Sequence, residues 1–319
     1  MMTPGTPCPT KLVVTGASGL LGANFVMEAM HRWDVVALSD RHRLAIPGVK
    51  CCQLDLTHAM DAVLLLNELQ PEVIVHLAAA TDVDWCEGHH LAAHRLNVGV
   101  TRTLAGWAAD RGVRFVFMST DSVFDGVRGA YQEQDPVGPV NCYATTKTEA
   151  EDVVRTRVAD HLIIRASIYG WNAQPKTSLA EWVLGELSQG RQVPGFTDAI
   201  FSPTLVNTLA GNILQLLLQP AGGTYHAGSS NAASKYEFAE AVAREFGFEG
   251  KRVEPSLLTK ARLRSPRPLN VSLDSRKLHS MLGNSPAAIQ DDLARFRHLG
   301  ANGFAANLKT ILSVPHEHN

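Results

Sequence analysis

A tyrosine and a lysine lie four residues apart in the segment Asn141-Cys142-Tyr143-Ala144-Thr145-Thr146-Lys147. On a helix, this spacing places both side chains on one face, within reach of a common partner. An ammonium group beside a phenol favours the phenolate and lowers its pKa from the ordinary value of about 10. The pair therefore suits proton transfer by Tyr143. The plainer interpretation is that Tyr143 packs and Lys147 is solvated, and the rest of the chain must decide between the two.

A glycine-rich turn near the start of the chain has the pattern of a phosphate-binding loop. Residues 11–15 (KLVVT) predict a buried strand and residues 20–32 a helix, with a GxxGxxG sequence between them. Glycine permits a tight turn and close approach of backbone to ligand, and the amides at a helix N-terminus can hold a pyrophosphate. We therefore expect a dinucleotide to bind at Gly16, Ser18, Gly19, Leu20, Leu21 and Gly22.

The end of the second predicted strand, residues 34–39, bears on the choice of dinucleotide. An acidic residue there would pair with the ribose hydroxyls of NAD, whereas basic residues accommodate a 2′-phosphate. Ser39 stands at the strand end, Asp40 follows, and Arg41 and Arg43 lie just beyond. This pattern favours NADP(H), with NAD(H) as the alternative. These side chains are also compatible with an ordinary turn.

The elements around these motifs alternate between strand and helix. Strands are predicted at 11–15, 34–39, 49–54, 73–78, 114–119 and 161–166, and helices at 20–32, 59–69, 91–111 and 143–159. Alternating elements with continuous apolar strands indicate a parallel sheet covered on both faces. We expect an α/β fold with a Rossmann-like, doubly wound parallel sheet over residues 1–170, which residues 206–227 rejoin. Residues 171–205 and 228–319 should form a smaller C-terminal substrate lobe.

Composition narrows the class of protein. The chain has 319 residues, is 45% hydrophobic and 19% charged, and carries a net charge of -2. Without a block of basic residues, binding to nucleic acid or to an anionic membrane is not expected. The five cysteines form no CxxC pair, which argues against a disulfide framework or structural zinc and favours a reducing, cytoplasmic location. No apolar run is long enough for a membrane span. No metal site is expected, because His89, His90 and His94 lack matching acidic or thiol ligands.

Five motifs in order resemble those of an extended short-chain dehydrogenase/reductase. They are the GxxGxxG loop, Asp55-Leu56, HLAAAT at 76–81, STD at 119–121 and YxxxK at 143–147. Within that group, AAATDVDWCE (78–87), STDSVFDG (119–126) and RPLN (267–270) are similar to segments of the dTDP-4-dehydrorhamnose reductase family. The chain departs from the family pattern at His76, Trp85, Cys86 and Ser122.

The resemblance and the fold assign the same roles to the motif residues. In a Rossmann sheet, the end of the fifth strand and the start of the following helix both lie at the carboxyl edge, where ligands bind. The hydroxyls of Thr120 and Tyr143 should therefore converge on one carbonyl oxygen. Tyr143 would donate its proton, Thr120 would orient the carbonyl, and Lys147 would lower the pKa of the phenol and hold the nicotinamide ribose.

Other residues are assigned from their positions beside these motifs. Asp121 would accept a hydrogen bond from substrate or cap the following turn. Arg262 and Arg267 either meet a nucleotide-sugar diphosphate or belong to a solvated basic loop. Trp171 is a candidate for stacking on a base or sugar, and Asn97 is either a satisfied core amide or a link to a neighbouring loop. The cofactor should be bordered by Asp55, Leu56, Leu77, Ala78, Ala79 and Thr81.

These residues favour an NADPH-dependent reductase of a 4-keto nucleotide sugar. The first alternative is a sugar-nucleotide epimerase or dehydratase of the same superfamily. The second is a non-catalytic, NADP-binding regulatory subunit of another enzyme, since a retained fold does not guarantee turnover. The resemblance also allows a homodimer.

Overall fold

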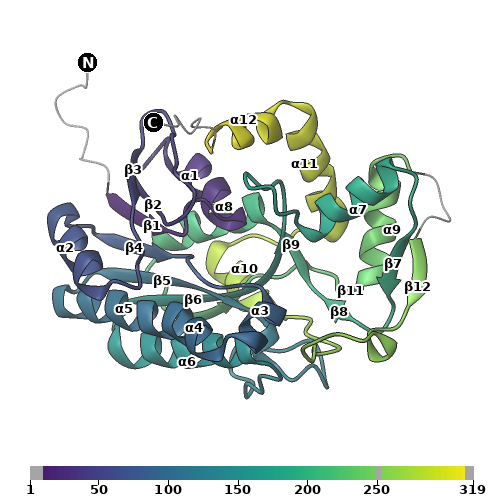
Figure 1. Cartoon of the computed structure of the whole chain (residues 1–319), viewed down its shortest axis with the longest axis horizontal. Helices are drawn as coiled ribbons and strands as arrows, with labels where there is room; N and C mark the ends of the chain where they lie inside the picture. The colour runs from purple at the N-terminus through teal and green to yellow at the C-terminus, as the bar shows by residue number, and fades with distance from the viewer. Residues whose placement is uncertain (1–9, 249–252, 313–319) are drawn as a thin grey trace.

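The computed structural model describes residues 10–248 and 253–312, and its centre is a parallel sheet (Figure 1). The strands follow the order β10-β6-β5-β4-β1-β2-β3, and each neighbouring pair is parallel. This is the doubly wound order predicted from the sequence, so the predicted fold class is confirmed. The strands are β1 (Lys11–Thr15), β2 (Asp34–Ser39), β3 (Lys50–Gln53), β4 (Val73–His76), β5 (Arg114–Thr120), β6 (His161–Tyr169) and β10 (Gly223–His226).

Helices cover both faces of the sheet, which explains why its inner strands are apolar throughout. One face carries α1 (Leu20–Ala29), α8 (Val206–Leu217) and α10 (Arg276–Leu282). The other carries α2 (Ala59–Leu69), α5 (Val100–Arg111) and α6 (Cys142–Arg157). Side chains of one strand alternate between the two faces: Leu12 and Val14 join the first cluster, and Val13 joins the second.

A smaller lobe lies beyond the carboxyl end of β6, on the right of Figure 1. Its core packs Tyr169 against Phe238 and Phe296 with ring centroids 5.0 and 5.8 Å away. Ser178 and Ser234 begin helices with reciprocal capping boxes to Glu181 and Glu237. The lobe contains α7 (Leu179–Ser188), β7 (Val193–Phe196), β8 (Ile200–Phe201), β11 (Ala233–Ser234), α9 (Lys235–Glu245), β12 (Val253–Ser256) and α11 (Ile289–Ala301). The short strand β9 (Pro203–Leu205) pairs with the end of β6 and so belongs to the main sheet.

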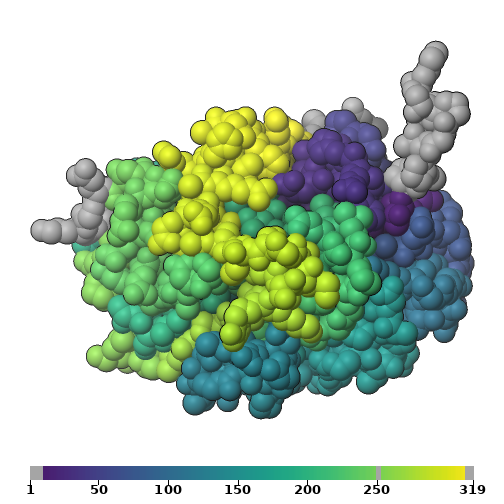
Figure 2. All heavy atoms as spheres, turned by 180° about the vertical axis from the view of Figure 1, so that it is seen from behind, coloured from purple at the N-terminus to yellow at the C-terminus, as the bar shows by residue number. Residues whose placement is uncertain are grey.

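The chain returns to the sheet near its C-terminus. Leu308, in α12 (Phe304–Thr310), and Ile311 pack in the same cluster as α1 and α8, and the backbone N–H of Ala45 donates to the Ile311 carbonyl at 2.9 Å. In Figure 2 the yellow C-terminal segments accordingly border the purple N-terminal ones. The lobe boundaries predicted at 171–205 and 228–319 stay a prediction. The packing adds that α10, α12 and Ile311 contact the sheet.

The structure differs from the sequence-based elements in two places. The single helix expected over 91–111 consists of α4 (His90–His94), a π-helical turn (Arg95–Gly99) and α5, preceded by the short α3 (Val83–Gly88). No strand was assigned from the sequence to residues 193–205, yet this segment contributes three short strands that pair with residues far away in sequence. No described helix is long and apolar enough to cross a membrane. The predicted features at 1–9, 250–252 and 313–319, Cys8 among them, lie outside the described residues.

Candidate active site

The phosphate loop lies between β1 and α1, and packing of its backbone demands glycine at two positions. Gly16 has φ of +65°, and a Cβ there would lie 2.7 Å from the backbone of Ala78. A Cβ on Gly22 would lie 2.2 Å from the carbonyl oxygen of Gly16. The start of α1 has no side-chain cap and no acidic residue in its first turn, so its amide groups and positive end remain available. This donor set suits a pyrophosphate.

The end of β2 lies beside this loop. The backbone N–H of Ala17 donates to the carbonyl of Leu38 at 3.0 Å, and Ser39 is buried. Arg41 and Arg43 are exposed, and the nitrogen Nε of Arg41 lies 3.8 Å from a carboxylate oxygen of Asp40. Both guanidinium groups are therefore free to approach an anionic group beyond the strand end.

The loop after β4 is tied to the end of β1 through one hydroxyl. The side chain of Thr15 accepts hydrogen bonds from the backbone N–H groups of Leu77 and Ala78, both at 3.2 Å. The same hydroxyl lies 2.7 Å from Nδ1 of His76. Leu77, Ala78 and the following residues are partly or fully exposed at this edge. Leu77 and Ala78 are thus held at the end of β1, and the contact with a cofactor expected of them, of Ala79 and of Thr81 stays a prediction.

Asp55 follows β3 at the same edge of the sheet. Its carboxylate accepts the backbone N–H of Thr57 at 2.9 Å, which holds the pKa of Asp55 below its usual value. Leu56, the next residue, is buried among α2 and the sheet. Both residues stabilise a turn here, and their predicted contact with a cofactor stays a prediction.

Thr120 and Tyr143 meet where β5 ends and α6 begins. Asn141 caps α6 by accepting the backbone N–H of Ala144 at 2.9 Å, which fixes the first turn that carries Tyr143. The hydroxyls of Thr120 and Tyr143 are hydrogen-bonded to each other. Lys147, one turn later, donates from Nζ to the carbonyl of Met118 at 2.6 Å and lies 4.0 Å from the ring centroid of Phe117.

Burial determines the acidity of this group of residues. It raises the pKa of Tyr143 above the ordinary range, although the hydrogen bond with Thr120 acts in the opposite direction. It also lowers the pKa of Lys147 to about 7, with Glu151 opposing the shift. The ammonium group of Lys147 is directed to the backbone of β5, and desolvation dominates the pKa of the phenol, so the lowering of that pKa by Lys147 stays a prediction.

Ser119, the neighbour of Thr120 with the same chemistry, belongs to a different network. Its hydroxyl donates to Glu151 at 2.5 Å, and Glu151 forms a buried ion pair with Arg165 at 2.6 Å. Side chains of adjacent strand residues point to opposite faces of the sheet. The geometry therefore selects Thr120, and not Ser119, as the hydroxyl beside Tyr143.

Asn97, in the π-helical turn, links three parts of the site. Its amide accepts the backbone N–H of Ala80 at 2.8 Å and donates to the carbonyl of the same residue at 3.1 Å. It also donates to the hydroxyl of Thr146 at 2.9 Å. Of the two interpretations given for Asn97, the link to a neighbouring loop is the one observed.

The predicted substrate residues occupy different environments. Asp121 is buried, and the hydroxyls of Thr120 and Ser122 donate to its Oδ1 at 3.1 and 3.2 Å. The turn after β5 is capped by Thr120, not by Asp121, because the backbone N–H of Ser122 donates to the Thr120 hydroxyl. Burial raises the pKa of Asp121, and the nearby Lys235 opposes this shift.

Arg267 lies near the site, whereas Arg262 is exposed. A guanidinium nitrogen of Arg267 lies 3.1 Å from the Asp84 carboxylate, and the neighbouring Pro266 carbonyl accepts a hydrogen bond from Asn141 at 3.0 Å. The segment that contains Arg267 therefore touches the start of α6. Arg262 has no comparable contact among the described residues. A role for either residue in binding diphosphate stays a prediction.

Trp171 does not present a free stacking surface. Its ring lies 4.3 Å from that of Phe296 in a stacked arrangement, and its Nε1 donates to the Phe296 carbonyl at 2.9 Å. The expectation that Trp171 stacks on a base or sugar was therefore wrong, because the side chain packs α11 against the sheet domain. Its backbone carbonyl accepts a hydrogen bond from Asn24 of α1 at 2.9 Å.

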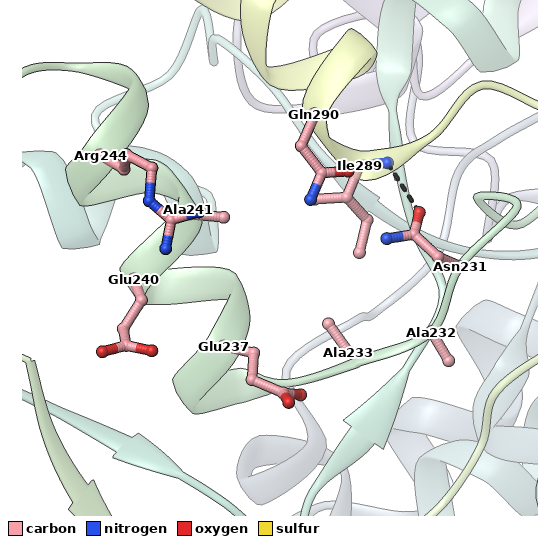
Figure 3. A pocket seen from close by; sticks show the side chains of 9 residues that line it. All are labelled: Asn231, Ala232, Ala233, Glu237, Glu240, Ala241, Arg244, Ile289 and Gln290. Atoms are coloured by element: carbon pink, nitrogen blue, oxygen red, sulfur yellow. Dashed lines mark hydrogen bonds between the residues drawn. The ribbon is translucent and has the colours of Figure 1, made fainter.

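A pocket of about 250 Å³ lies away from these residues, between α9 and the start of α11 (Figure 3). Asn231 closes one side of it by accepting the backbone N–H of Ile289 at 2.9 Å. None of the predicted site residues lines this pocket. Among the described residues, no group of three His, Cys, Asp or Glu side chains is arranged to hold a metal ion.

A doubly wound sheet with a glycine-rich loop after β1 and a Thr-Tyr-Lys group at β5 and α6 defines an extended short-chain dehydrogenase/reductase. Residues 10–299 match the family model described as the RmlD substrate binding domain. The chain belongs to this family.

Individual relatives have different recorded functions. The chain is 33% identical over 287 residues to a probable low-salt glycan biosynthesis reductase of Haloferax volcanii, covering 88% of this chain and 95% of the relative. It is 32% identical over 302 residues to the methionine adenosyltransferase 2 subunit beta of Danio rerio, covering 90% and 91%. It shares its fold with dTDP-4-dehydrorhamnose reductase of Bacillus anthracis in complex with NADP, with a TM-score of 0.81, 24% identity and coverage of 91% and 99%.

Lys235 is the residue beside the site that the sequence did not indicate. It lies 114 positions after Asp121 in the sequence and belongs to the smaller lobe. The local pattern around it signals only a capping box at the start of α9. Its position near Asp121 results from how the two lobes pack, for which the sequence contains no spacing signal.

Proposed function

We propose that this protein is an NADPH-dependent reductase of a 4-keto nucleotide sugar. The observation that carries the proposal is the meeting of the Thr120 and Tyr143 hydroxyls at the carboxyl edge of the sheet, beside the glycine-rich loop. Two hydroxyl groups placed together can hold one carbonyl oxygen and supply it with a proton. The reductase relatives support the direction of the reaction.

Each residue would have a distinct task. Tyr143, kept protonated by burial, donates its proton to the carbonyl oxygen of the sugar. Thr120 orients that oxygen and stabilises the negative charge that develops on it. Lys147 is held under the site by the Met118 carbonyl and would bind the nicotinamide ribose through its remaining N–H groups.

NADPH would supply the hydride, and three parts of the chain would hold it. The uncapped start of α1 and the glycine loop would bind the pyrophosphate. Arg41 and Arg43 would meet the 2′-phosphate, which favours NADPH over NADH. The Bacillus anthracis reductase of the same fold contains NADP, in support of this choice.

The test is oxidation of NADPH, followed by its absorbance, with purified protein and a panel of 4-keto nucleotide sugars. NADH is run in parallel. Turnover with one member, with stoichiometric formation of the reduced sugar, would support the reductase. An epimerase or dehydratase would instead change the sugar without net consumption of NADPH, so the ratio of oxidised cofactor to product separates the two.

A second candidate, a non-catalytic NADP-binding subunit, is favoured by the similarity to methionine adenosyltransferase 2 subunit beta. In that case NADPH should bind without turnover on any keto sugar. Addition of the purified protein should then change the activity of a methionine adenosyltransferase from the same source. Retention of Thr120, Tyr143 and Lys147 in one group argues for catalysis.

A further inference from the structure

Lys235 is the first residue of α9 in the smaller lobe. Its backbone N–H donates to the carbonyl of Ala199 at 2.9 Å, and β11, just before it, pairs with β8. From β8 the backbone N–H of Ile200 donates to Leu269 at 2.6 Å, and Asn270 donates to Gly126 at 2.9 Å. This series of backbone contacts holds the start of α9 against the segment that follows Asp121.

The ammonium group of Lys235 is left without a polar partner by its own chain. Nζ lies 3.2 Å from the centroid of the Phe201 ring. Across residues 10–248 and 253–312, it donates no hydrogen bond and has no carboxylate oxygen within 4.0 Å. A cation at the first position of a helix is also disfavoured by the helix dipole. The contact with the Phe201 ring stabilises the ammonium group but leaves its hydrogen-bond donors unused.

Asp121 is the group of opposite charge that acts on Lys235. Each of the two groups favours the ionised form of the other, although they do not form a direct ion pair. Both hydroxyl contacts of Asp121 go to Oδ1, so its carboxylate has acceptor capacity left. Asp121 is also bonded to Thr120, which places the pair beside the proposed position of the reacting carbonyl.

We propose that Asp121 and Lys235 together bind a hydroxyl group of the sugar, on the carbon next to the carbonyl that is reduced. A hydroxyl donates one hydrogen bond and accepts others, which matches a carboxylate and an ammonium group held apart. A phosphate would be repelled by Asp121, and a charged amino group by Lys235. The pair would thus select keto sugars with a free hydroxyl at that carbon over deoxy and amino sugars. This inference rests on the proposed function.

The experiment compares two substrates in three proteins. The substrates are a 4-keto nucleotide sugar with a hydroxyl beside the keto group and its analogue with hydrogen there. The proteins are wild type, Lys235→Met and Lys235→Arg. Wild type should prefer the hydroxyl substrate in kcat/KM by roughly 10- to 100-fold, the range for a hydrogen bond to a charged group. In Lys235→Met this preference should fall by roughly 10-fold, chiefly through loss with the hydroxyl substrate, with Asp121 supplying what remains. Lys235→Arg should restore much of it.

Lys260→Met is the matched control, because Lys260 is an exposed lysine of the same lobe. Its substrate preference should equal that of wild type. NADPH binding and thermal unfolding are measured for every variant. An equal loss of kcat/KM for both substrates in Lys235→Met would assign Lys235 a structural role and overturn the inference, leaving the reductase intact.

Failure of the proposed function is recognised separately through equilibrium binding. Calorimetry in the presence of NADP gives two Kd values, one for the free nucleotide diphosphate and one for the nucleotide sugar that carries the hydroxyl. Their ratio reports how much the sugar contributes to binding. If no keto sugar is turned over but this ratio collapses in Lys235→Met, the reductase is overturned while the role of Lys235 in binding the sugar is supported. If the sugar contributes nothing to binding in wild type, both are overturned.

Discussion

Burial has opposite effects on the two ionisable residues of the Thr-Tyr-Lys group. It keeps the phenol of Tyr143 protonated and lowers the pKa of Lys147 to about 7. The phenol is therefore in its proton-donating form across the neutral range, but its raised pKa makes it a weaker acid until other groups stabilise the phenolate. Anionic groups that approach Lys147 would raise its pKa and favour the charged ammonium form.

Replacement of Tyr143 by Phe should abolish reduction and leave cofactor binding nearly unchanged. The phenol is the only proton donor assigned to the carbonyl oxygen, and general acid catalysis contributes roughly 100- to 10,000-fold to rate. The measurement is kcat with the accepted keto sugar together with the Kd for NADPH. Cys142→Ser, at the preceding position, is the control and should keep most activity. Substantial turnover by Tyr143→Phe would reassign the proton donor.

Joint replacement of Arg41 and Arg43 by Ala should weaken NADPH binding much more than NADH binding. Both guanidinium groups are exposed beside the end of β2, and only NADPH carries the 2′-phosphate they would meet. Kd values for both cofactors, measured at one ionic strength, give the result. Arg32→Ala, an exposed arginine before the strand, should leave both values unchanged. Equal losses for the two cofactors would contradict the preference for NADP.

The Thr-Tyr-Lys group and the glycine loop could be predicted because their signals are local. Tyr143 and Lys147 share a helix, and Gly16, Gly19 and Gly22 fall within seven consecutive residues that join β1 to the first turn of α1. Lys235 could not be found this way, since only tertiary packing brings it near Asp121. The stacking proposed for Trp171 failed for the same reason: its ring partner, Phe296, lies in a helix 125 residues away.

The interrupted helix before β5 shows how an element can serve a site. A regular helix over 91–111 would have matched the sequence pattern, but the π-helical turn at Arg95–Gly99 shifts the register by one residue. That shift places Asn97 toward the loop at Ala80 and toward Thr146 of α6. Periodicity predicts where a helix lies, and it does not detect one extra residue in a turn. Strand positions on the sheet were predicted closely, since each strand is a continuous apolar run.

Replacement of Asn97 by Ala should destabilise the protein by about 1–3 kcal/mol, because it removes the side-chain partner of the part-buried Ala80 N–H and one of the two partners of the Ala80 carbonyl. The free energy of unfolding in urea is the measurement. NADPH should also bind more weakly, since the loop after β4 borders the phosphate loop. Thr103→Ala, which removes a longer hydrogen bond to Gly99 at 3.3 Å, should change stability by less than about 0.5 kcal/mol. If the two variants lower the free energy of unfolding equally, the hydrogen bonds of Asn97 do not stabilise the loop at Ala80.

Two buried imidazoles connect the stability of the whole molecule to pH. Burial lowers the pKa of His76 to about 3 and that of His226 to about 4, against an ordinary value near 6.5. His76 lies between Thr15 and Thr101. His226 donates from Nδ1 to the Tyr131 carbonyl and accepts a hydrogen bond from Arg165 at Nε2. Both remain neutral in the folded chain at a pH where the unfolded chain protonates them.

The free energy of unfolding should therefore fall as pH decreases from about 6.5 to about 4, because the unfolded state then binds more protons. Each imidazole contributes up to about 1.4 kcal/mol per pH unit. The raised pKa of Asp121 and Asp292 acts in the opposite direction, so the comparison with variants isolates the histidines. His76→Asn should reduce the slope by about one proton, and His31→Asn, at an exposed position, should leave it unchanged. An unchanged slope in His76→Asn would show that this imidazole titrates normally.

The glycines of the first turn have a consequence for how the ancestry of such proteins is interpreted. A side chain at Gly16 would collide with Ala78, and one at Gly22 would collide with the backbone of Gly16 itself. Both collisions are internal to the polypeptide, so they persist whether or not a dinucleotide is ever bound. A descendant that lost its cofactor would still be obliged to inherit these glycines. The glycine motif is therefore required for folding and does not by itself indicate catalysis. The joint presence of Thr120, Tyr143 and Lys147 is the better indicator of catalysis.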